Sequence, residues 1–333
     1  MSQLNYNSDS VGKGDQLRLA NPTRWRRLAF IIAGVIVVIG LALGLGLGLG
    51  LRNGDDDDSG NEDLGPPDTG VNRTLKWTPA VGDSWQIILL HPIDLTKELT
   101  PDVAVYDLDL FNNDAENFSE LQKKGKKVIC YFSAGSYEDW RDDKDKFQAE
   151  DLGKELDGWP GEKWLKLSSE NVRSIMAARI KIAADKGCDA IDPDNVDGYQ
   201  NDNGLDLTAK DSVDFMKFLS LEAAKYKMAV GLKNAGDIIE QALPYVDFSV
   251  NEQCGQFDEC GTFEKFITAN KPVFRIEYPK EELPKGTSLA DESKRRCASQ
   301  GAGEFSTVLK NMNLDGWVEY CDGKTFTTSI QDA

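Results

Sequence analysis

Residues 168–195 read SSENVRSIMAARIKIAADKGCDAIDPDN, and residues 208–234 read TAKDSVDFMKFLSLEAAKYKMAVGLKN. Each stretch starts with a residue that caps helices, continues at helical spacing and ends in a short, largely apolar run. The sequence predicts helices over 170–186, ending before Gly187, and over 209–227, where Thr208 and Asp211 form a capping-box pattern. The apolar faces would be Val172, Ile175, Met176, Ile180 and Ala183, and then Phe215, Phe218, Leu219, Ala223 and Tyr226. A helix followed by a strand, repeated along the chain, is typical of parallel βα units.

Eight short runs after residue 76 have the composition of strands and alternate with helical patterns. They are 85–90, 103–111, 126–133, 164–167, 189–195, 228–234, 247–253 and 272–278. Eight such units in about 250 residues predict an α/β fold of the (β/α)8 TIM-barrel type over 76–333.

A doubly wound open sheet is the alternative fold. It usually carries a glycine-rich phosphate loop after its first strand. Here the first predicted strand is followed by His91-Pro92-Ile93-Asp94, and the domain has neither GxGxxG nor GxxxxGK[ST]. The sequence therefore favours the barrel and disfavours nucleotide binding.

A membrane anchor is expected before the domain. Residues 28–51 form 24 uncharged residues, enough to cross a bilayer as a signal anchor. Basic residues precede this segment, and Asp55–Asp58 follow it, so residues 1–27 are expected in the cytoplasm. The protein would be a single-pass type II protein of the cell membrane, with 52–75 as an acidic Gly/Pro linker and an extracellular domain. Asn72 and Asn117 begin sequons that would suit glycosylation there.

Charge is distributed unevenly along the chain. The first 27 residues carry five basic and two acidic side chains, and Arg52 adds one positive charge, so the remainder of a chain of net charge −18 carries −22. A surface this negative repels nucleic acid and attracts cationic polymers.

The six cysteines, an even number, suit three disulfides in a translocated domain. Cys254–Cys260 would close a short loop, Cys297–Cys321 would tie the C-terminal region, and Cys130 and Cys188 would remain for each other. Six cysteines allow 15 pairings, so other connectivities stay open. With one histidine and no CxxC pair, no metal site and no cofactor are expected.

Polar side chains concentrate at the predicted strand ends, where barrel enzymes place their chemistry. They include Asp107, Asp109, Tyr131, Ser133, Asp192, Asp194, Asn195, Lys233, Asn234, Glu252 and Glu277. Charges within apolar strands are unfavourable to bury without a partner or a purpose. Several carboxylates without a histidine cluster indicate acid/base chemistry, and glycoside hydrolysis is the reaction class that needs two of them.

Several motifs occur in an order that resembles glycoside hydrolase family 114. They are CYFSAGSYEDW at 130–140, LDGWPGEKW at 156–164, DPDNVDGY at 192–199, GLKN at 231–234 and NEQC at 251–254. The resemblance covers about 76–280. With the predicted anchor, the chain is similar to fungal membrane-anchored endo-α-1,4-polygalactosaminidases.

This resemblance implies a (β/α)8 hydrolase that cleaves α-1,4-linked galactosamine stretches of galactosaminogalactan, a cationic polysaccharide of cell wall and biofilm. It maps the catalytic acids onto Asp194 and Glu252, as nucleophile and general acid/base of a retaining mechanism, or with these roles reversed. Asp107, Asp109, Tyr131, Ser133, Asp192, Asn195, Tyr199, Lys233, Asn234 and Glu277 would line the substrate subsites. The catalytic domain is expected to be monomeric.

Two other functions stay open from the sequence. The first is a catalytically inactive carbohydrate-binding surface protein, which would bind polymer without releasing reducing ends. The second is a hydrolase of different specificity, resembling an α-galactosidase.

Overall fold

The structure is a computed structural model that describes residues 73–281 and 283–331. The predicted cytoplasmic tail, membrane segment, nearly all of the linker and Asn72 lie outside these residues. Among the helices that are described, none has the length and apolar character needed to span a bilayer.

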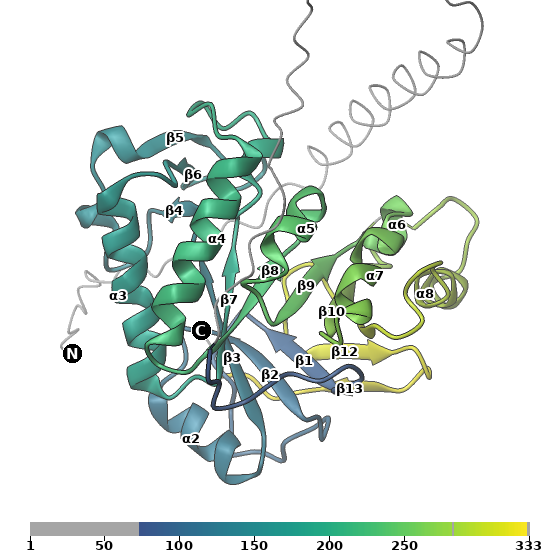
Figure 1. The fold of residues 1–333 in the computed structure, drawn as a ribbon. Coiled ribbons are helices and arrows are strands. Elements are labelled where there is room, and N and C mark those ends of the chain that lie inside the picture. The colour runs from purple at the N-terminus through teal and green to yellow at the C-terminus, as the bar shows by residue number, and fades with distance from the viewer. Residues whose placement is uncertain (1–72, 282, 332–333) are drawn as a thin grey trace, which may run out of the picture. The chain divides into compact units, whose positions relative to one another are not determined.

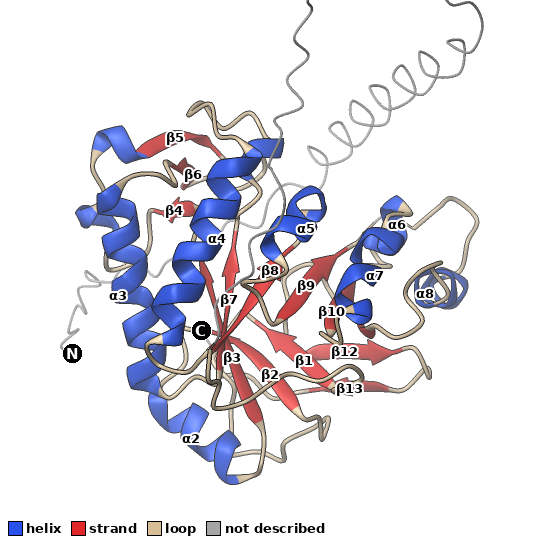
Figure 2. Ribbon diagram, viewed as in Figure 1, coloured by secondary structure: helices blue, strands red, loops and turns tan. Residues whose placement is uncertain are grey.

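A curled sheet with eight consecutive parallel strands forms the centre of the fold (Figure 1). The strand order is β1-β2-β3-β7-β8-β9-β10-β11, which is the order of these strands along the chain. Their bounds are β1 (Trp85–Ile88), β2 (Val105–Asp109), β3 (Lys127–Ser133), β7 (Ala190–Asp194), β8 (Ala229–Lys233), β9 (Phe248–Glu252), β10 (Val273–Glu277) and β11 (Ser306–Leu309). Helices lie along the outside of this sheet, so the fold is a TIM-like α/β fold (Figure 2).

The two ends of the parallel sheet approach each other. The indole Nε1 of Trp85 on β1 donates to the carbonyl of Ser306 on β11 at 2.7 Å. After β11 the chain turns back as β12 (Trp317–Tyr320) and β13 (Thr325–Thr327), which extend the sheet with antiparallel strands. The Tyr320 hydroxyl on β12 donates to the carbonyl of Trp85 at 2.9 Å, so the C-terminal segment joins the first strand to the last.

All eight predicted strands overlap observed strands, but the one predicted at 164–167 does not belong to the parallel sheet. Trp164 and Leu165 belong to β6 (Glu162–Leu165), in a separate antiparallel sheet of order β4-β6-β5. The other strands of this sheet are β4 (Ser136–Glu138) and β5 (Leu152–Glu155), so the sheet is an insert between β3 and β7. A four-residue apolar run carries no information about its partners, which explains the error. The true eighth strand, β11, was missed because STVL is short and half polar.

The helices are α2 (Ala115–Lys123), α3 (Glu170–Lys186), α4 (Ala209–Ala224), α5 (Ile239–Ala242), α6 (Cys254–Phe257), α7 (Cys260–Thr268) and α8 (Leu289–Cys297). Helix α3 has the predicted bounds, with Ser169 accepting from the Val172 amide and Gly187 left-handed after its end. Helix α4 has the predicted capping box of Thr208 and Asp211. It ends at Ala224, three residues earlier than predicted, and Lys227 beyond its end has a positive φ of 58°. Four 3-10 turns complete the helices: η1 (Lys144–Lys146), η2 (Ala149–Asp151), η3 (Gly198–Gln200) and η4 (Gly236–Ile238).

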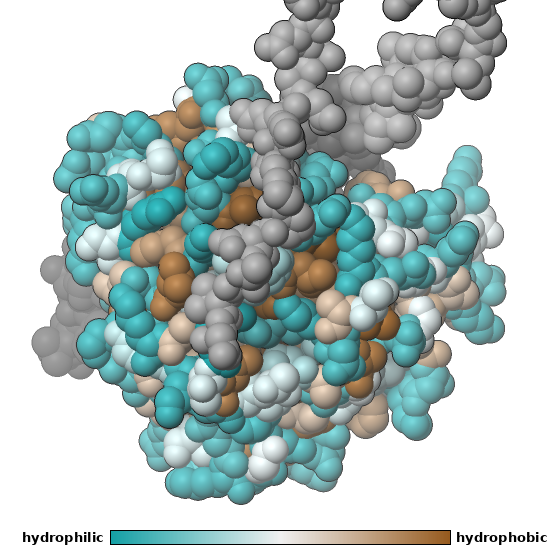
Figure 3. Space-filling view, in the orientation of Figure 1, coloured by the Kyte–Doolittle hydropathy of each residue, from teal (hydrophilic) through white to brown (hydrophobic). Residues whose placement is uncertain are grey.

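The hydrophobic core has two layers, one on each face of the parallel sheet. Apolar side chains inside the curl include Ile87, Val105, Ile129, Val250 and Phe274. The larger layer lies between strands and helices and includes Phe132, Ile180 and Phe215. Hydrophilic side chains cover most of the face seen in Figure 3, and hydrophobic ones appear there as separate areas.

All three expected disulfides are present. Cys130 on β3 bonds Cys188 just before the neighbouring β7, with Cα atoms 6.0 Å apart. Cys254–Cys260 joins the starts of α6 and α7, and Cys297–Cys321 joins the end of α8 to the residue after β12. Each pair has a Cα separation in the range that disulfides accept.

Candidate active site

Two carboxylates and one ammonium group meet where three adjacent strands end. Asp194 ends β7, Lys233 ends β8 and Glu252 ends β9. The Lys233 Nζ lies 3.2 Å from Asp194 Oδ1 and 3.1 Å from Glu252 Oε2. The lysine side chain is 3% exposed, whereas those of Asp194 and Glu252 are 17% and 23% exposed. The ammonium is therefore buried beneath two carboxylates that solvent reaches.

These contacts limit the separation of the two carboxylates. Since the distances to the shared ammonium are 3.2 and 3.1 Å, the two oxygens lie no more than about 6.3 Å apart. Carboxyl groups in retaining glycosidases are separated by about 5–5.5 Å and those in inverting enzymes by about 6.5–9.5 Å. The limit falls below the inverting range.

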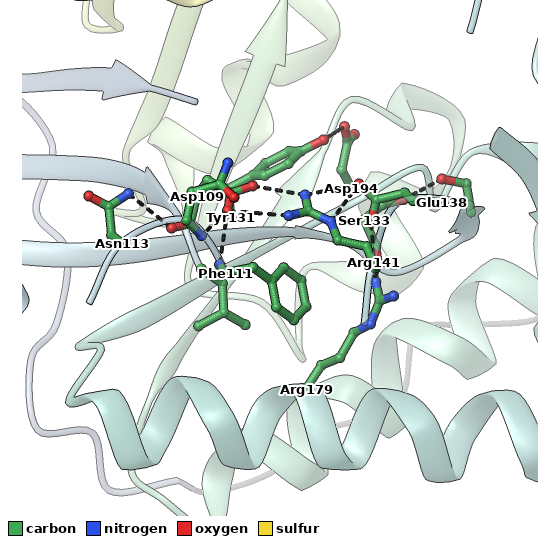
Figure 4. A network of polar contacts seen from close by, with 12 residues as sticks. Asp109, Phe111, Asn113, Tyr131, Ser133, Glu138, Arg141, Arg179 and Asp194 are labelled. Atoms are coloured by element: carbon green, nitrogen blue, oxygen red, sulfur yellow. Dashed lines mark hydrogen bonds and ion pairs between the residues drawn. The ribbon is translucent and has the colours of Figure 1, made fainter. Parts of the chain in front are cut away.

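Further donors hold each carboxylate in place. Asp194 accepts from the Tyr131 hydroxyl at 2.8 Å and from the Asn195 amide at 2.8 Å (Figure 4). Glu252 accepts from the Tyr278 hydroxyl and from Asn234 Nδ2, the latter at 3.4 Å. With Lys233, every carboxylate oxygen of this pair has at least one donor, which fixes the orientation of both groups.

Charge also governs the buried lysine. Burial alone would lower the pKa of Lys233, because it disfavours the charged form. The negative charges of Asp194, Glu252 and Asp192 outweigh this effect and raise the pKa of Lys233 well above its ordinary value. The lysine is therefore a permanent cation in this site.

Below this pair, Asp107 on β2 and Asp192 on β7 form a second set of carboxyl groups. Both side chains are fully buried, and their oxygens have no hydrogen-bond partner among the described residues. Burial and the charge of Asp192 raise the pKa of Asp107 well above its ordinary range. Burial also raises the pKa of Asp192 to about 7, against the opposing effect of Lys233. Both carboxyl groups therefore lie deeper than the Asp194–Glu252 pair, and burial favours their protonated forms.

Asp109, two residues beyond Asp107, has a different environment. Arg141 Nη2 lies 2.8 Å from its Oδ2, and the amides of Phe111 and Asn112 donate to its Oδ1 (Figure 4). The same arginine donates from Nε to Glu138 at 2.9 Å. Its guanidinium also lies over the Phe111 ring, 4.5 Å from the centroid. These contacts favour a structural role for Asp109 rather than the substrate contact predicted for it.

Glu277 also lies in a fully paired position. Its carboxylate accepts from Arg275 Nε at 3.0 Å, Arg296 Nη1 at 3.2 Å and the Gly255 amide at 2.6 Å, and the side chain is fully buried. Period-two alternation explains the placement, since Phe274 and Ile276 point into the curl and the next inward residue is Tyr278. The alternation would have identified Tyr278, which contacts Glu252, in place of Glu277.

The remaining predicted site residues are placed as follows. Ser133 and Asn195 contact each other near Asp194, with Asn195 Nδ2 donating to Ser133 Oγ at 2.9 Å. Tyr199 is half-buried, and its hydroxyl has no partner in the described part of the chain. Asn234 accepts from the Glu252 amide at 2.8 Å, so it orients the end of β9.

Two further groups of residues have features of other kinds of site. Asn117 lies in α2, half-buried, and its side-chain amide donates to the carbonyl of Ile93 at 3.4 Å. Cys254, Cys260 and Glu277 are close enough together to suggest a metal site, but both sulfurs belong to a disulfide and offer no thiolate.

Known proteins resemble the chain at the level of both sequence and structure. The family model described as glycoside-hydrolase family GH114 matches residues 67–326. The crystal structure of Aspergillus fumigatus Ega3 in complex with galactosamine is 55% identical, covering 74% of this chain and 98% of that one, with a TM-score of 0.70. The glycoside hydrolase domain of PelA from Pseudomonas aeruginosa is 14% identical, covering 69% and 95%, with a TM-score of 0.51, and shows likeness of fold alone. A comparison with curated proteins gave no match. The family match spans most of the chain and includes every strand of the parallel sheet, so this chain belongs to glycoside-hydrolase family GH114.

Proposed function

We propose that this glycoside hydrolase cleaves α-1,4-linked galactosamine stretches within galactosaminogalactan. The observation that carries the proposal is the pair Asp194 and Glu252 on one buried ammonium, in a chain 55% identical to a protein crystallised with galactosamine. The charge of −22 after residue 52 supports it, since an acidic protein attracts a polymer of protonated amines.

The proposed mechanism is retaining, with Asp194 as the nucleophile. Its short side chain is fixed by the amide of the next residue and by the Tyr131 hydroxyl. Its oxygen attacks the anomeric carbon, and the bond to the leaving sugar breaks. Glu252, which is longer and more exposed, donates a proton to the departing oxygen. In the second step Glu252 takes a proton from water, which attacks the same carbon and releases Asp194.

Mass spectrometry of the products tests this function. The chain is incubated with partially deacetylated galactosaminogalactan, and neutral α-galactosides are assayed in parallel. We expect oligosaccharides of several lengths from the polymer, as an endo-acting enzyme gives, and no release from the α-galactosides. Asp194→Ala and Glu252→Ala should each abolish cleavage, and each variant should still unfold in one cooperative transition.

Other outcomes point to other functions. Polymer binding without product would indicate a carbohydrate-binding protein. Release of galactose from the neutral substrates would indicate a different specificity. Full activity of either alanine variant would contradict the assignment of that carboxylate.

We also propose that residues 28–51 anchor the protein in the cell membrane, with the hydrolase domain outside. The supporting observation is the run of 24 uncharged residues with basic residues before it and aspartates after it. Protease added to intact cells should remove the domain and leave a small N-terminal fragment in the membrane fraction. Resistance of the domain in intact cells would contradict this orientation.

A further inference from the structure

The insert sheet β4-β6-β5 buries a carboxylate that has no cation of its own. Glu162 on β6 is 7% exposed, and no ion pair joins it to any residue in 73–281 or 283–331. The neighbouring Glu138, paired with it across β4 and β6, is instead held by Arg141 and Arg179. A buried carboxylate without a counter-charge is unfavourable, so its position calls for a functional reason.

A chain of hydrogen bonds leads from Glu162 to the reacting carboxylate. The Ser136 hydroxyl donates to Glu162 Oε2 at 2.7 Å, and its oxygen lies 2.5 Å from Ser133 Oγ. The Asn195 side-chain amide donates to Ser133 Oγ at 2.9 Å and to Ser136 Oγ at 3.2 Å. The main-chain amide of Asn195 donates to Asp194 Oδ1 at 2.8 Å. These five contacts connect β6 of the insert with the end of β7.

The main chain at Asn195 explains why this chain of contacts matters. Asn195 has a φ of 60°, in the left-handed region that is unfavourable for most residues. The amides of Ala134 and Gly135 donate to the carbonyl of Asp194 at 2.9 and 3.0 Å. A Cβ on Gly135 would lie 1.7 Å from the Asn195 carbonyl oxygen, so the two segments touch. The conformation that aims the Asn195 amide at Asp194 therefore depends on support from the start of the insert.

Electrostatics give a second connection between Glu162 and the same carboxylate. Burial raises the pKa of Glu162 to about 8, and the negative charges of Glu138 and Asp194 act in the same direction. The hydrogen bond from Ser136 and the charge of Arg141 oppose this shift. Burial raises the pKa of Tyr131 well above its ordinary value, and the charges of Asp194, Glu138 and Glu162 add to this effect. Above about pH 8, where Glu162 is ionised, its charge thus helps Tyr131 to keep the proton that it donates to Asp194.

We propose that Glu162 is a positioning residue for the hydrolysis reaction, which holds Asn195 through Ser136 and so orients the Asp194 carboxylate. The proposal rests on the proposed function, because it assigns a role relative to Asp194 as a reacting group. It also gives the insert sheet a purpose in catalysis, since β4 contributes Ser136 and β6 contributes Glu162.

Four variants test the proposal: Glu162→Ala, Glu162→Gln, Ser136→Ala and the double variant with both alanines. Glu162→Ala and Ser136→Ala should each lower kcat about 10- to 100-fold, the effect of a slightly misplaced reacting group, with KM within twofold. The double variant should lose no more than the larger single loss, because both changes break one chain. Glu162→Gln retains an acceptor for Ser136 and should keep kcat within threefold.

The pH profile separates positioning from general stability. A plot of wild-type kcat against pH should show a transition with an apparent pKa near 8. The same plot for Glu162→Gln should lack this transition. Glu150→Ala is the matched control, because Glu150 is exposed in η2 of the same insert. It should leave kcat, KM and the pH profile unchanged.

Several results would overturn the proposal. Wild-type kcat in Ser136→Ala would do so, as would losses that multiply in the double variant. If Glu162→Ala does not fold, the kcat of Ser136→Ala alone decides whether the proposal holds. Failure of the wild type to cleave the polymer contradicts the proposed function, whereas an active wild type, an inactive Asp194→Ala and unaffected Glu162 variants contradict this inference only.

Discussion

Replacing Lys233 by methionine should separate the two reacting carboxylates. Methionine keeps much of the apolar stem and removes the ammonium that lies 3.2 Å from Asp194 and 3.1 Å from Glu252. The two oxygens, no more than about 6.3 Å apart, would then repel each other by about 3 kcal/mol at an effective dielectric constant of 20 when both groups are ionised. Glu252 carries its proton in the reacting arrangement, so the loss in kcat comes from the missing contact that orients both groups; a misplacement of about 1 Å corresponds to a loss of about 100-fold.

The same substitution should lower stability. Removing one partner of a buried ion pair usually costs about 3–5 kcal/mol, because the remaining charges are uncompensated. For a domain of this size that lowers the melting temperature by about 6–20 °C. Asp194 and Glu252 are 17% and 23% exposed, so the lower end of the range is expected.

The assay compares initial rates of reducing-end release at neutral pH, well below the melting temperature of each variant. Lys163→Met is the control, because Lys163 is exposed on β6 and the change in charge is the same. The control should match the wild type. A Lys233→Met variant with more than a third of wild-type kcat and an unchanged melting temperature would refute the reasoning.

Three further predictions concern pH and salt. Glu162→Gln should be more stable than the wild type by up to about 5 kcal/mol at pH 9 and nearly equal at pH 4.5. The difference in stability grows with pH because Glu162 releases its proton near pH 4.5 in the unfolded chain and only near pH 8 in the folded protein. Urea unfolding that gives the same difference in stability at every pH would contradict this prediction. Burial lowers the pKa of Lys310 to about 7, and the ammonium bonds only neutral oxygens of Gln86 and Asp315 among the described residues. Wild-type stability should therefore rise between pH 7 and 10.5, where the unfolded chain binds the extra proton, and Lys310→Met should abolish that rise in urea titrations. Finally, KM for deacetylated polymer should increase several-fold from 50 to 500 mM salt with kcat steady, because salt screens the attraction; a KM independent of salt would show that charge does not drive binding.

Much of the parallel sheet could be predicted from the sequence because its strands are short apolar runs between helices with clear ends. Helix α3 begins at a serine cap and ends at a left-handed glycine, and both signals are local. The run at 164–167 shows the limit of such reasoning. Its residues suit a strand, and they form one, but its partners are β4 and β5 rather than the parallel sheet.

Some residues of the candidate site can likewise be predicted from the sequence, whereas others follow only from the structure. Asp194 and Glu252 were identified from the ends of strands and from motifs, without knowledge of their distance. Glu277 and Tyr278 both lie at the end of a predicted strand, but only the side of the strand on which each lies decides that Tyr278 reaches Glu252. Glu162 lies within the LDGWPGEKW motif, but its contacts with Ser136, 26 residues earlier, and through Ser136 with Asn195, just after β7, follow only from the fold.

The sequence alone determined the order of helices and strands, the polar residues at strand ends and the acidic charge, since each depends on neighbouring residues or on composition. Only the tertiary structure decided which carboxylates share Lys233, which are neutralised by Arg141 or Arg296, and which stay buried without partners. The physical reason is that electrostatic energy depends on distance and burial. Asp194 and Tyr131, 63 positions apart, and Lys233 and Glu252, 19 positions apart, acquire both only when the strands pair in the sheet.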